Sequence, residues 1–527
     1  MYGHPISKEL QKINQGYPLT QNASVLAGHK IKTEIPANKL LDTVTLLKKH
    51  GASLLTLVGV DEREIKGGFG VYLVFSLSAA IMEIKVSLDP DHPSYPSVTP
   101  VIPAAHWLER EIKDWLGIVP QGHPDLRRLA VHPDWPSDVF PLRKDFPAHG
   151  EVPRVEGEME FFPVKGEGIY QVPVGPIHAG IIEPGHFRFF TFGEDVINLQ
   201  AQLFYTHRGI EKTAEGKHFH QAALIAERIC GACSASHTIA YAQAIEALAG
   251  VVIPKRAQYI RTILLEMERL YNHVGDIGNI CAGIGFNFAI SRGAILREHL
   301  MRLNMRLTGH RYLRGTVIPG GVKINLKASS ELSSIRSELS QIEEKLCQLT
   351  EIMLASHSLL DRMQTTGILP KETANDLGAV GTAARASAVN RDLRRDLPYA
   401  AYREVKFAVP IQQEGDVFCR LKQRIDEGKQ SFAILQQAFE QLPPGEIRVK
   451  IPDLTPYQTA IGYTESARGA NVHWIMSGPN NTLYRYMVRS ASHCNWPVLP
   501  LCVPGNIIPD FPLINKSFEL CYACLDR

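Results

Sequence analysis

Two cysteines three positions apart, Cys230 and Cys233, are the residues of this sequence whose type and spacing first suggest chemistry. Only Gly231 and Ala232 separate them, and a glycine permits the tight turn that brings the second thiol back beside the first. Such a pair is compatible with half of a structural zinc site, a dithiol redox pair, or half of a site for another thiophilic metal. Two unliganded buried cysteines are a further alternative, because free cysteine packs as a small hydrophobe.

Two basic residues flank this pair. Arg228 stands just before it, and His237 follows Cys233 by four positions. A nearby cation lowers the pKa of a thiol and favours the thiolate that binds metals. Both side chains are equally compatible with packing or surface roles, so the first pair alone does not select one chemistry.

A second pair with the same spacing, Cys521 and Cys524, stands close to the end of the sequence. Four thiolates from two tight turns form a closed set of soft donors. A structural zinc module usually draws both pairs from a segment of about 20 residues, because the metal replaces a core there. The wide separation here favours a reactive metal at a buried centre, although zinc and an iron-sulfur cluster both remain open.

The composition predicts a soluble globular protein of two or more domains. The chain has 527 residues, of which 45% are hydrophobic and 21% charged. Lys and Arg number 56 against 54 Asp and Glu, so no nucleic-acid partner is expected. Nine scattered cysteines indicate a reducing compartment. Neither a signal peptide nor an apolar run of about 18 residues is found, which predicts a cytoplasmic protein that reaches a membrane only through partner subunits.

The first part of the chain is predicted to be an α+β domain spanning residues 1–146. Residues 39–47 and 104–116 have the periodicity of amphipathic helices. Three runs have the pattern of strands: 52–58, 69–76 and 81–87. No catalytic set is found here, which favours a domain for contacts. Residues 147–170 are rich in Glu, Pro and Gly and are predicted to be a linker.

The remainder, residues 171–527, is predicted to be a mainly α-helical bundle with short β pieces. Apolar residues recur in steps of three and four along 254–270 and 332–363, which is typical of helices that pack into a core. The last hundred residues contain several prolines and are expected to be broken up. The fold class is therefore an α+β domain followed by a mainly helical catalytic domain.

Three polar residues in this second part are further candidates. Glu183 lies in a Pro/Gly turn before a predicted strand, where it either solvates the turn or carries protons to a nearby redox centre. Glu211 either ends a helix in solvent or offers a hard oxygen ligand. Arg468 precedes a glycine at a predicted turn and could hold its guanidinium over a site.

The segment 228–237, the upstream run 208–211 and the final pair of cysteines together resemble the large, catalytic subunits of the nickel-iron hydrogenases. The similarity is greatest to the energy-converting, membrane-associated branch of the formate hydrogenlyase and hydrogenase-4 type. Residues 93–146 resemble the 30-kDa subunit of respiratory complex I, and 171–527 resembles both hydrogenase large subunits and the complex I 49-kDa subunit. The resemblance covers about residues 50–527.

This resemblance implies a role for each thiol and for two charged residues. Cys230, Cys233, Cys521 and Cys524 would bind nickel, and the second thiol of each pair would bridge to an iron that carries carbon monoxide and cyanide. Glu183 would relay protons, with Cys524 as the other candidate base. Arg468 would lie over the diatomic ligands, where its charge favours heterolytic splitting of hydrogen.

Further expectations concern the surroundings of the centre. His237 would donate a hydrogen bond to a cysteine sulfur, and Arg228 would stand beside the cofactor. Glu211 resembles a glutamate that ligates magnesium in other members. Two departures bear on this pattern: Glu519-Leu520 replaces the usual Asp-Pro before the third thiol, and Arg527 stands where many members have a histidine.

The resemblance implies an enzyme that interconverts H2 with protons and electrons, evolving H2 within a membrane-bound complex on the inner face of the membrane. The implied partners are an iron-sulfur small subunit, complex I-like membrane subunits, formate dehydrogenase or ferredoxin, a maturation protease and nickel-insertion factors. One alternative is a quinone-reducing subunit of a complex I-like NADH dehydrogenase, which has no need of four thiols at these positions. The other is a scaffold with a structural zinc.

Overall fold

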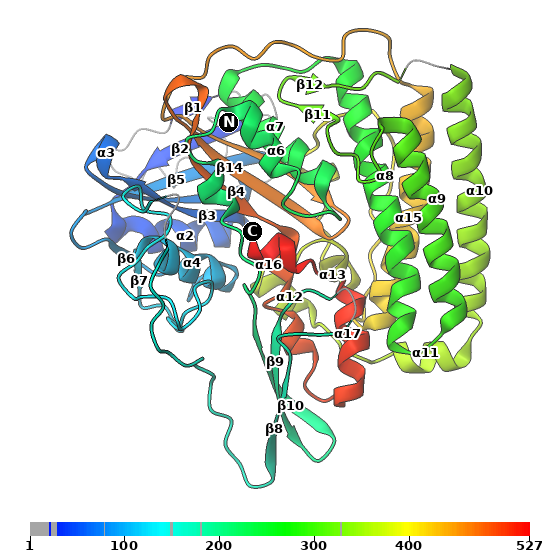
Figure 1. Ribbon diagram of the computed structural model, residues 1–527, viewed down its shortest axis with the longest axis horizontal. Coiled ribbons are helices and arrows are strands. Elements are labelled where there is room, and N and C mark those ends of the chain that lie inside the picture. The colour runs from blue at the N-terminus through cyan, green and yellow to red at the C-terminus, as the bar shows by residue number, and fades with distance from the viewer. Residues whose placement is uncertain (1–19, 23–28, 78, 148–150, 180–181, 327–328) are drawn as a thin grey trace.

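A mixed five-stranded sheet forms the core of the N-terminal part in the computed structural model, which describes residues 20–22, 29–77, 79–147, 151–179, 182–326 and 329–527 (Figure 1). Its strand order is β1-β2-β5-β4-β3. The strands are β1 (Thr20–Asn22), β2 (His29–Glu34), β3 (Ser53–Glu62), β4 (Gly68–Leu77) and β5 (Ala80–Leu88). Only β2 and β5 pair in parallel. Residues 1–19 of the predicted first domain and 148–150 of the predicted linker lie outside the described residues.

Two helices accompany this sheet, α2 (Leu40–Lys49) and α4 (His106–Leu116). α4 packs against β3, where Gly59 leaves room for the side chains of Ile112 and Leu116. The short elements of this region are α3 (Arg63–Lys66), β6 (Ser94–Pro96) and β7 (Val119–Gln121). The predicted helices and all three predicted strands are confirmed, with ends that differ by a few residues.

Four long helices lie side by side at the right of Figure 1: α8 (Lys255–Ile280), α9 (Asn287–Thr308), α10 (Ser329–Leu354) and α15 (Val417–Glu440). α8 packs on α9 and α15, and α10 packs on the same two helices. The predicted stripe along α10 is buried from Ile335 to Met353, which explains its steps of three and four. The predicted helix 332–363 ends early, and α11 (His357–Met363) follows as a separate element.

The expectation of a broken-up C-terminal region is wrong, because it contains a three-stranded antiparallel sheet. Its strands are β13 (Thr459–Ser466), β14 (Gly469–Ser477) and β15 (Leu483–Arg489). β13 and β14 are buried along their whole length, since α7 (Ser234–Ala249) packs on them and β14 and β15 also contact β3. A strand covered on both faces loses the alternation of polar and apolar residues that marks a strand. The chain is therefore mixed α/β, and the description as a helical bundle fits only the four long helices.

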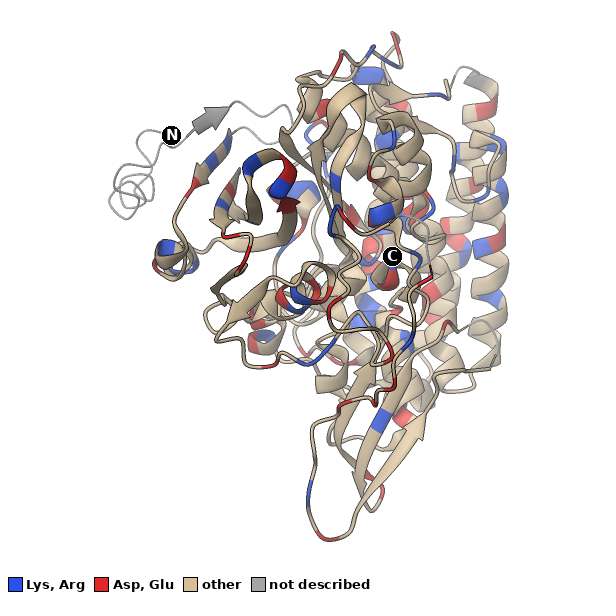
Figure 2. Cartoon of the chain, turned by 60° about the vertical axis from the view of Figure 1, so that its left-hand side comes forward, with Lys and Arg blue, Asp and Glu red and all other residues tan. Residues whose placement is uncertain are grey.

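A second three-stranded sheet projects at the bottom of Figure 1 and consists of β8 (Ile169–Val174), β9 (His186–Phe192) and β10 (Asp195–Gln202). The described part of residues 151–168 forms no helix or strand. Acidic and basic residues are both scattered over the whole cartoon in Figure 2. Among the described helices, none has the length and apolar character to cross a membrane.

The remaining elements are short. Two short helices, α5 (Ile210–Ala214) and α6 (Phe219–Ala226), precede the long helices in the sequence. The strands β11 (Val317–Ile318) and β12 (Gly321–Val322) lie between α9 and α10. The helices α12 (Lys371–Asp376), α13 (Gly381–Ala386) and α14 (Leu393–Asp396) lie between α11 and α15. The chain closes with α16 (Ala491–Asn495), α17 (Phe511–Phe518) and α18 (Tyr522–Asp526).

Close packing of β13 on α7 leads to a first prediction. A Cβ atom at Gly462 would lie 1.9 Å from the carbonyl oxygen of Ala240 on α7. We expect Gly462→Ala to lower the free energy of unfolding by more than about 3 kcal/mol, because neither backbone can give way. Gly428→Ala is the control: its Cβ would meet nothing closer than Leu346 at 4.0 Å, so on α15 it should be neutral or stabilising by up to about 1 kcal/mol. Chemical denaturation measures both, and equal effects would contradict the prediction.

Candidate metal centre

The structure brings the two cysteine pairs together. The Sγ atoms of Cys230, Cys233, Cys521 and Cys524 all lie within 4.8 Å of one another. Three of these residues are buried and Cys521 is partly exposed. Two metal–thiolate bonds of about 2.3 Å span roughly this distance, so four such sulfurs fit around a metal. Among the described residues, this is the group of Cys, His, Asp and Glu side chains placed to hold a metal ion.

Each pair lies at the start of a helix. Cys233 is the N-cap of α7, and Cys521 is the N-cap of α18. The backbone N–H of Ala232 donates to Cys230 Sγ at 3.3 Å, and the N–H of Cys521 donates to Ser492 Oγ at 3.0 Å. The positive end of a helix dipole favours thiolates. The N–H of Ala232 therefore favours the anionic form of Cys230.

One arginine that sequence reasoning left without a role joins the two pairs. The guanidinium of Arg208 donates to the carbonyl oxygens of Arg228 at 3.0 Å, Ile229 at 2.7 Å and Ala523 at 3.0 Å. The side chain of Arg228 instead donates to Leu224 O at 2.7 Å and to the Glu227 carboxylate, and is 53% exposed. Arg208 is thus the arginine that contacts the segments of both cysteine pairs, which we call the first (228–233) and second (521–524) cysteine loops. It is the first residue of the motif 208–211.

His237 reaches a thiol through a chain of buried groups. Its Nε2 lies 3.4 Å from Cys524 Sγ, and its Nδ1 lies 2.9 Å from Nε2 of His473. Nδ1 of His473 in turn lies 2.8 Å from the hydroxyl of Tyr486. Burial lowers the pKa of His237 to about 4, so near neutral pH its imidazole is neutral and only one of its two ring nitrogens carries a proton. His473 and Tyr486 come from β14 and β15, and no motif identified them.

When both histidines are neutral, the hydrogen bonds from Tyr486 through His473 and His237 to Cys524 all run in one direction. If the Tyr486 hydroxyl donates to His473, then His473 Nε2–H donates to His237, and His237 Nε2–H donates to the sulfur of Cys524. The hydroxyl therefore fixes which histidine nitrogens carry protons. That order suits a thiolate at Cys524, since a thiolate only accepts.

Glu183 lies against the second cysteine loop. Its Oε2 accepts the backbone N–H of Ala523 at 2.9 Å. Burial raises the pKa of Glu183 above its ordinary value, and the Cys521 sulfur raises it further. The Pro/Gly turn before β9 thus holds a carboxyl beside the thiols.

Arg468 lies at the turn between β13 and β14, where the sequence placed it. Its guanidinium forms a two-pronged ion pair with Asp276 of α8, with Nη2 at 3.0 Å from Oδ1. Burial alone would lower the pKa of Arg468, but Asp276, with further contributions from Cys521, Glu519 and Cys233, raises it above its ordinary value. Arg468 Nε has no hydrogen-bond partner among the described residues. A buried donor without a partner is costly, so it fits a site that receives a further acceptor.

Glu519 shows how the chain accommodates the replacement of Asp-Pro. It ends α17 in the left-handed conformation, with φ of 51°, and accepts the side-chain N–H of Asn279 at 2.6 Å. A residue before proline is driven to extended backbone, so Leu520 permits this conformation. Burial raises the pKa of Glu519 to about 7, with a further contribution from Asp276.

Glu211 does not offer free oxygens to a metal. Its Oε2 accepts from Arg485 at 2.8 Å, and its Oε1 accepts from the N–H of Val488 at 3.1 Å and from Arg527 at 3.0 Å. The four thiols fit a thiophilic metal, whereas this glutamate, already paired with two guanidinium groups, does not fit magnesium.

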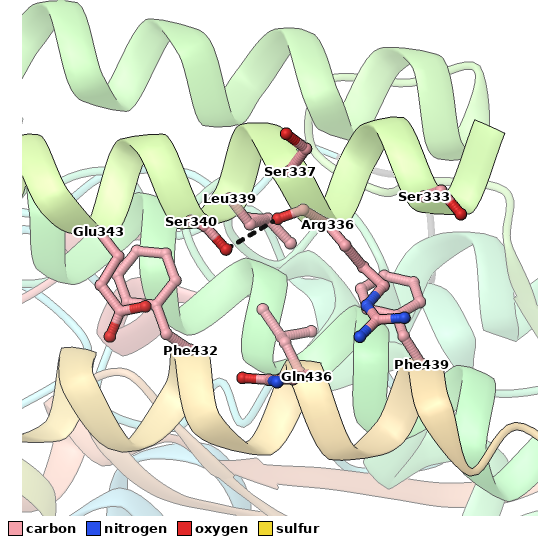
Figure 3. A pocket seen from close by; sticks show the side chains of 10 residues that line it. Ser333, Arg336, Ser337, Leu339, Ser340, Glu343, Phe432, Gln436 and Phe439 are labelled. Atoms are coloured by element: carbon pink, nitrogen blue, oxygen red, sulfur yellow. Dashed lines mark hydrogen bonds between the residues drawn. The ribbon is translucent and has the colours of Figure 1, made fainter. Parts of the chain in front are cut away.

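A groove on the surface lies apart from these residues (Figure 3). It has a volume of about 210 Å³ and runs between α10 and α15. Phe432 faces Glu343, and Phe439 faces Arg336. Its lining contains neither thiols nor any candidate site residue. This groove is therefore separate from the cluster of cysteines.

The chain matches three families of known proteins. Residues 208–276 match nickel-dependent hydrogenase, 33–152 match the 30 Kd subunit of respiratory-chain NADH dehydrogenase, and 284–462 and 454–527 match its 49 Kd subunit. Together with the four converging thiols, these matches define the class: the protein is an oxidoreductase of the hydrogenase type, related to complex I.

Full-length relatives narrow this class. The sequence is 36% identical to formate hydrogenlyase subunit 5 of Escherichia coli (strain K12), over 98% of this chain and 93% of that protein. It is also 36% identical to hydrogenase-4 component G of the same organism, over 94% of this chain and 88% of that protein. The chain belongs to this family of fused hydrogenase large subunits.

A solved structure shares the fold. One chain of the membrane-bound sulfane sulfur reductase, an archaeal respiratory membrane complex, aligns with a TM-score of 0.65 and 28% identity. The alignment covers 69% of this chain and all of that one. The named relatives thus come from formate hydrogenlyase, hydrogenase-4 and a membrane-bound sulfane sulfur reductase.

The series of hydrogen bonds that joins Tyr486 to Cys524 through two histidines leads to a second prediction. Tyr486→Phe should lower the free energy of unfolding by about 1–3 kcal/mol, because it leaves His473 Nδ1 buried without a partner. Tyr463→Phe is the matched control: this tyrosine is equally buried in the same sheet, and its hydroxyl has no partner among the described residues. Its removal should cost less than about 1 kcal/mol. Thermal and chemical unfolding compare the two, and equal losses would contradict a stabilising hydrogen bond between Tyr486 and His473.

Proposed function

We propose that this protein is the catalytic subunit of a nickel-iron hydrogenase that interconverts H2 with protons and electrons. Cys230, Cys233, Cys521 and Cys524 would hold the nickel, with Cys233 and Cys524 shared with an iron that carries carbon monoxide and cyanide. The observation that carries the proposal is the convergence of four sulfurs, from two distant segments, within 4.8 Å. When bound, such a centre supplies the redox chemistry that forms or splits the H–H bond.

The protein would contribute charge and orientation around this centre. Arg468 keeps a fixed positive charge in a buried position, and its Nε–H is available to an acceptor such as a diatomic ligand. His237 would donate to Cys524 and hold that sulfur in place. Arg228, half exposed, would act only through its position next to the first pair.

Glu183 would move the proton. The N–H of Ala523 holds its carboxylate one residue from Cys524, and its raised pKa brings the group nearer to the pH at which a general acid works best. Its partial exposure gives it a route towards solvent. Cys524 is the other candidate base, because its sulfur would be a ligand of the centre and could itself accept a proton there.

Electrons would leave through a partner. The other cysteines of the described chain do not join a metal-binding cluster, so an iron-sulfur small subunit would take the electrons. We further propose a domain division at residues 146 and 171, complex I-like membrane subunits, and formate dehydrogenase or ferredoxin as the electron source for H2 evolution. The subunit would lie on the inner face of the cell membrane, and a maturation protease and nickel-insertion factors would assemble it.

The alternative is quinone reduction in a complex I-like NADH dehydrogenase. Two of the three family matches, to the 49 Kd and 30 Kd subunits of respiratory-chain NADH dehydrogenase, support it. A quinone is reduced without any thiolate ligands, so that function leaves the four clustered cysteines unexplained. The cysteine cluster therefore favours the hydrogenase.

Metal analysis of natively matured protein tests the proposal. We expect about one nickel and at least one iron per chain, because four soft thiolates select such metals over harder ones. Infrared spectra should contain carbon monoxide and cyanide stretches. Zinc alone would support a structural site, absence of metal would support the quinone reductase, and a nickel-loaded sample without these stretches would contradict the proposed iron ligands.

Glu183→Gln tests the proton route. The amide keeps the shape and can still accept from Ala523, so nickel and iron contents should not change. Hydrogen–deuterium exchange and H2 turnover should fall by about 100-fold, since general acid catalysis contributes on this scale. Glu194→Gln, an exposed glutamate in the turn between β9 and β10, is the control and should leave both rates unchanged. Wild-type exchange in Glu183→Gln would remove this residue from the mechanism.

A further inference from the structure

The guanidinium of Arg527 occupies the space between two glutamates from different parts of the chain. Its Nη1 donates to Glu211 Oε1 at 3.0 Å and to the carbonyl oxygen of Val488 at 2.5 Å, and its Nη2 contacts the carboxylate of Glu111. Its Nε donates to Leu525 O at 3.1 Å. Glu111 belongs to α4 of the N-terminal part, whereas Glu211 begins α5 beside the first cysteine pair.

This site is closed. Arg527 is 2% exposed, Glu111 3% and Glu211 6%. Burial alone would raise the pKa of Glu111, but Arg527 and then His493, at 3.2 Å, outweigh burial and lower it. Buried carboxylates are stable only when such partners compensate them.

The charges in this site balance without a metal. Glu111 and Glu211 supply two negative charges, Arg527 and Arg485 supply two positive ones, and His493 adds a further one when it is protonated. Glu215, at 3.9 Å from Arg485, is itself paired with Lys144 at 2.8 Å. A bound Mg²⁺ would add two uncompensated positive charges to a buried place. Mg²⁺ also requires near-octahedral oxygen ligands at about 2.0–2.1 Å, whereas the oxygens here already accept from N–H donors.

We propose that the side chain of Arg527 is the permanent cation of this site and takes the place of a magnesium ion. It performs the structural task of a metal, because one positive group draws together Glu111 of the N-terminal part, Glu211 of α5 and the segment that carries Cys521 and Cys524. This proposal does not depend on the proposed hydrogenase activity, since it concerns only the ion pairs of Arg527 with Glu111 and Glu211.

Elemental analysis of wild-type protein is the first test. Magnesium should be well below stoichiometric after dialysis, while nickel and iron remain at the contents of the proposed centre. About one retained magnesium per chain would overturn the proposal. Because nickel is counted in the same sample, failure of the proposed function would appear as missing nickel and would leave the magnesium result readable.

Two variants provide the second test. Arg527→Gln removes the positive charge and supplies an amide oxygen, so millimolar Mg²⁺ should raise its melting temperature by about 2–4 °C over NaCl of equal ionic strength. Arg527→Lys keeps the charge, and like the wild type it should show no response to Mg²⁺. No response in Arg527→Gln, or an equal response in Arg527→Lys, would overturn the proposal. If Arg527→Gln does not fold, the elemental analysis of the wild type still decides.

Discussion

The structure depends on holding the C-terminal segment against the first cysteine loop. Four thiolates within 4.8 Å repel one another by about 3 kcal/mol per pair at an effective dielectric constant of about 20, so they do not assemble by themselves. Arg208 binds the carbonyls of both loops, and Asp526 accepts from the N–H groups of Phe204 at 3.0 Å and Thr206 at 2.9 Å. These contacts place the sulfurs of Cys521 and Cys524 beside the first pair. A bound metal cation would offset the remaining repulsion between the four thiolates.

Buried polar contacts connect the N-terminal part to the sheet β13–β15. Arg489 donates to the carbonyl of Leu55 at 2.6 Å, and the Glu83 carboxylate accepts from Trp474 at 3.0 Å. Burial alone would raise the pKa of Glu83, but Lys30 and Lys32 outweigh it and lower the pKa to about 2. Buried charges cost free energy unless paired, and pairs that cross between segments fix geometry. The N-terminal sheet thus supports β13–β15, and through α7 it supports Cys233.

The sequence predicted those features that depend on local pattern. The stripe along α10 and the strands β3 to β5 follow from periodicity, and the thiols follow from two Cys-x-x-Cys spacings. The sheet β13–β15 was missed because both faces are buried and no alternation marks its strands. His473 and Tyr486 were missed for a related reason: they reach His237 only after strands from the far end of the chain pair beside α7. Non-local pairing leaves no trace in a short window of residues.

Glu519 shows how the family pattern can change without dismantling the centre. Asp276 pairs with both Arg468 and Arg424, the latter at 3.2 Å, so one carboxylate faces two guanidinium groups. An ionised Glu519 balances this excess, whereas a protonated one leaves a net positive charge near the thiolates. A pKa of about 7 allows both forms near neutrality. Asn279 donates to the carboxyl in either form, and Leu520 permits the backbone that brings it there. The absent proline and the longer side chain are therefore linked: Leu520 permits the left-handed backbone at Glu519, and the carboxyl then lies at 2.6 Å from the side-chain nitrogen of Asn279.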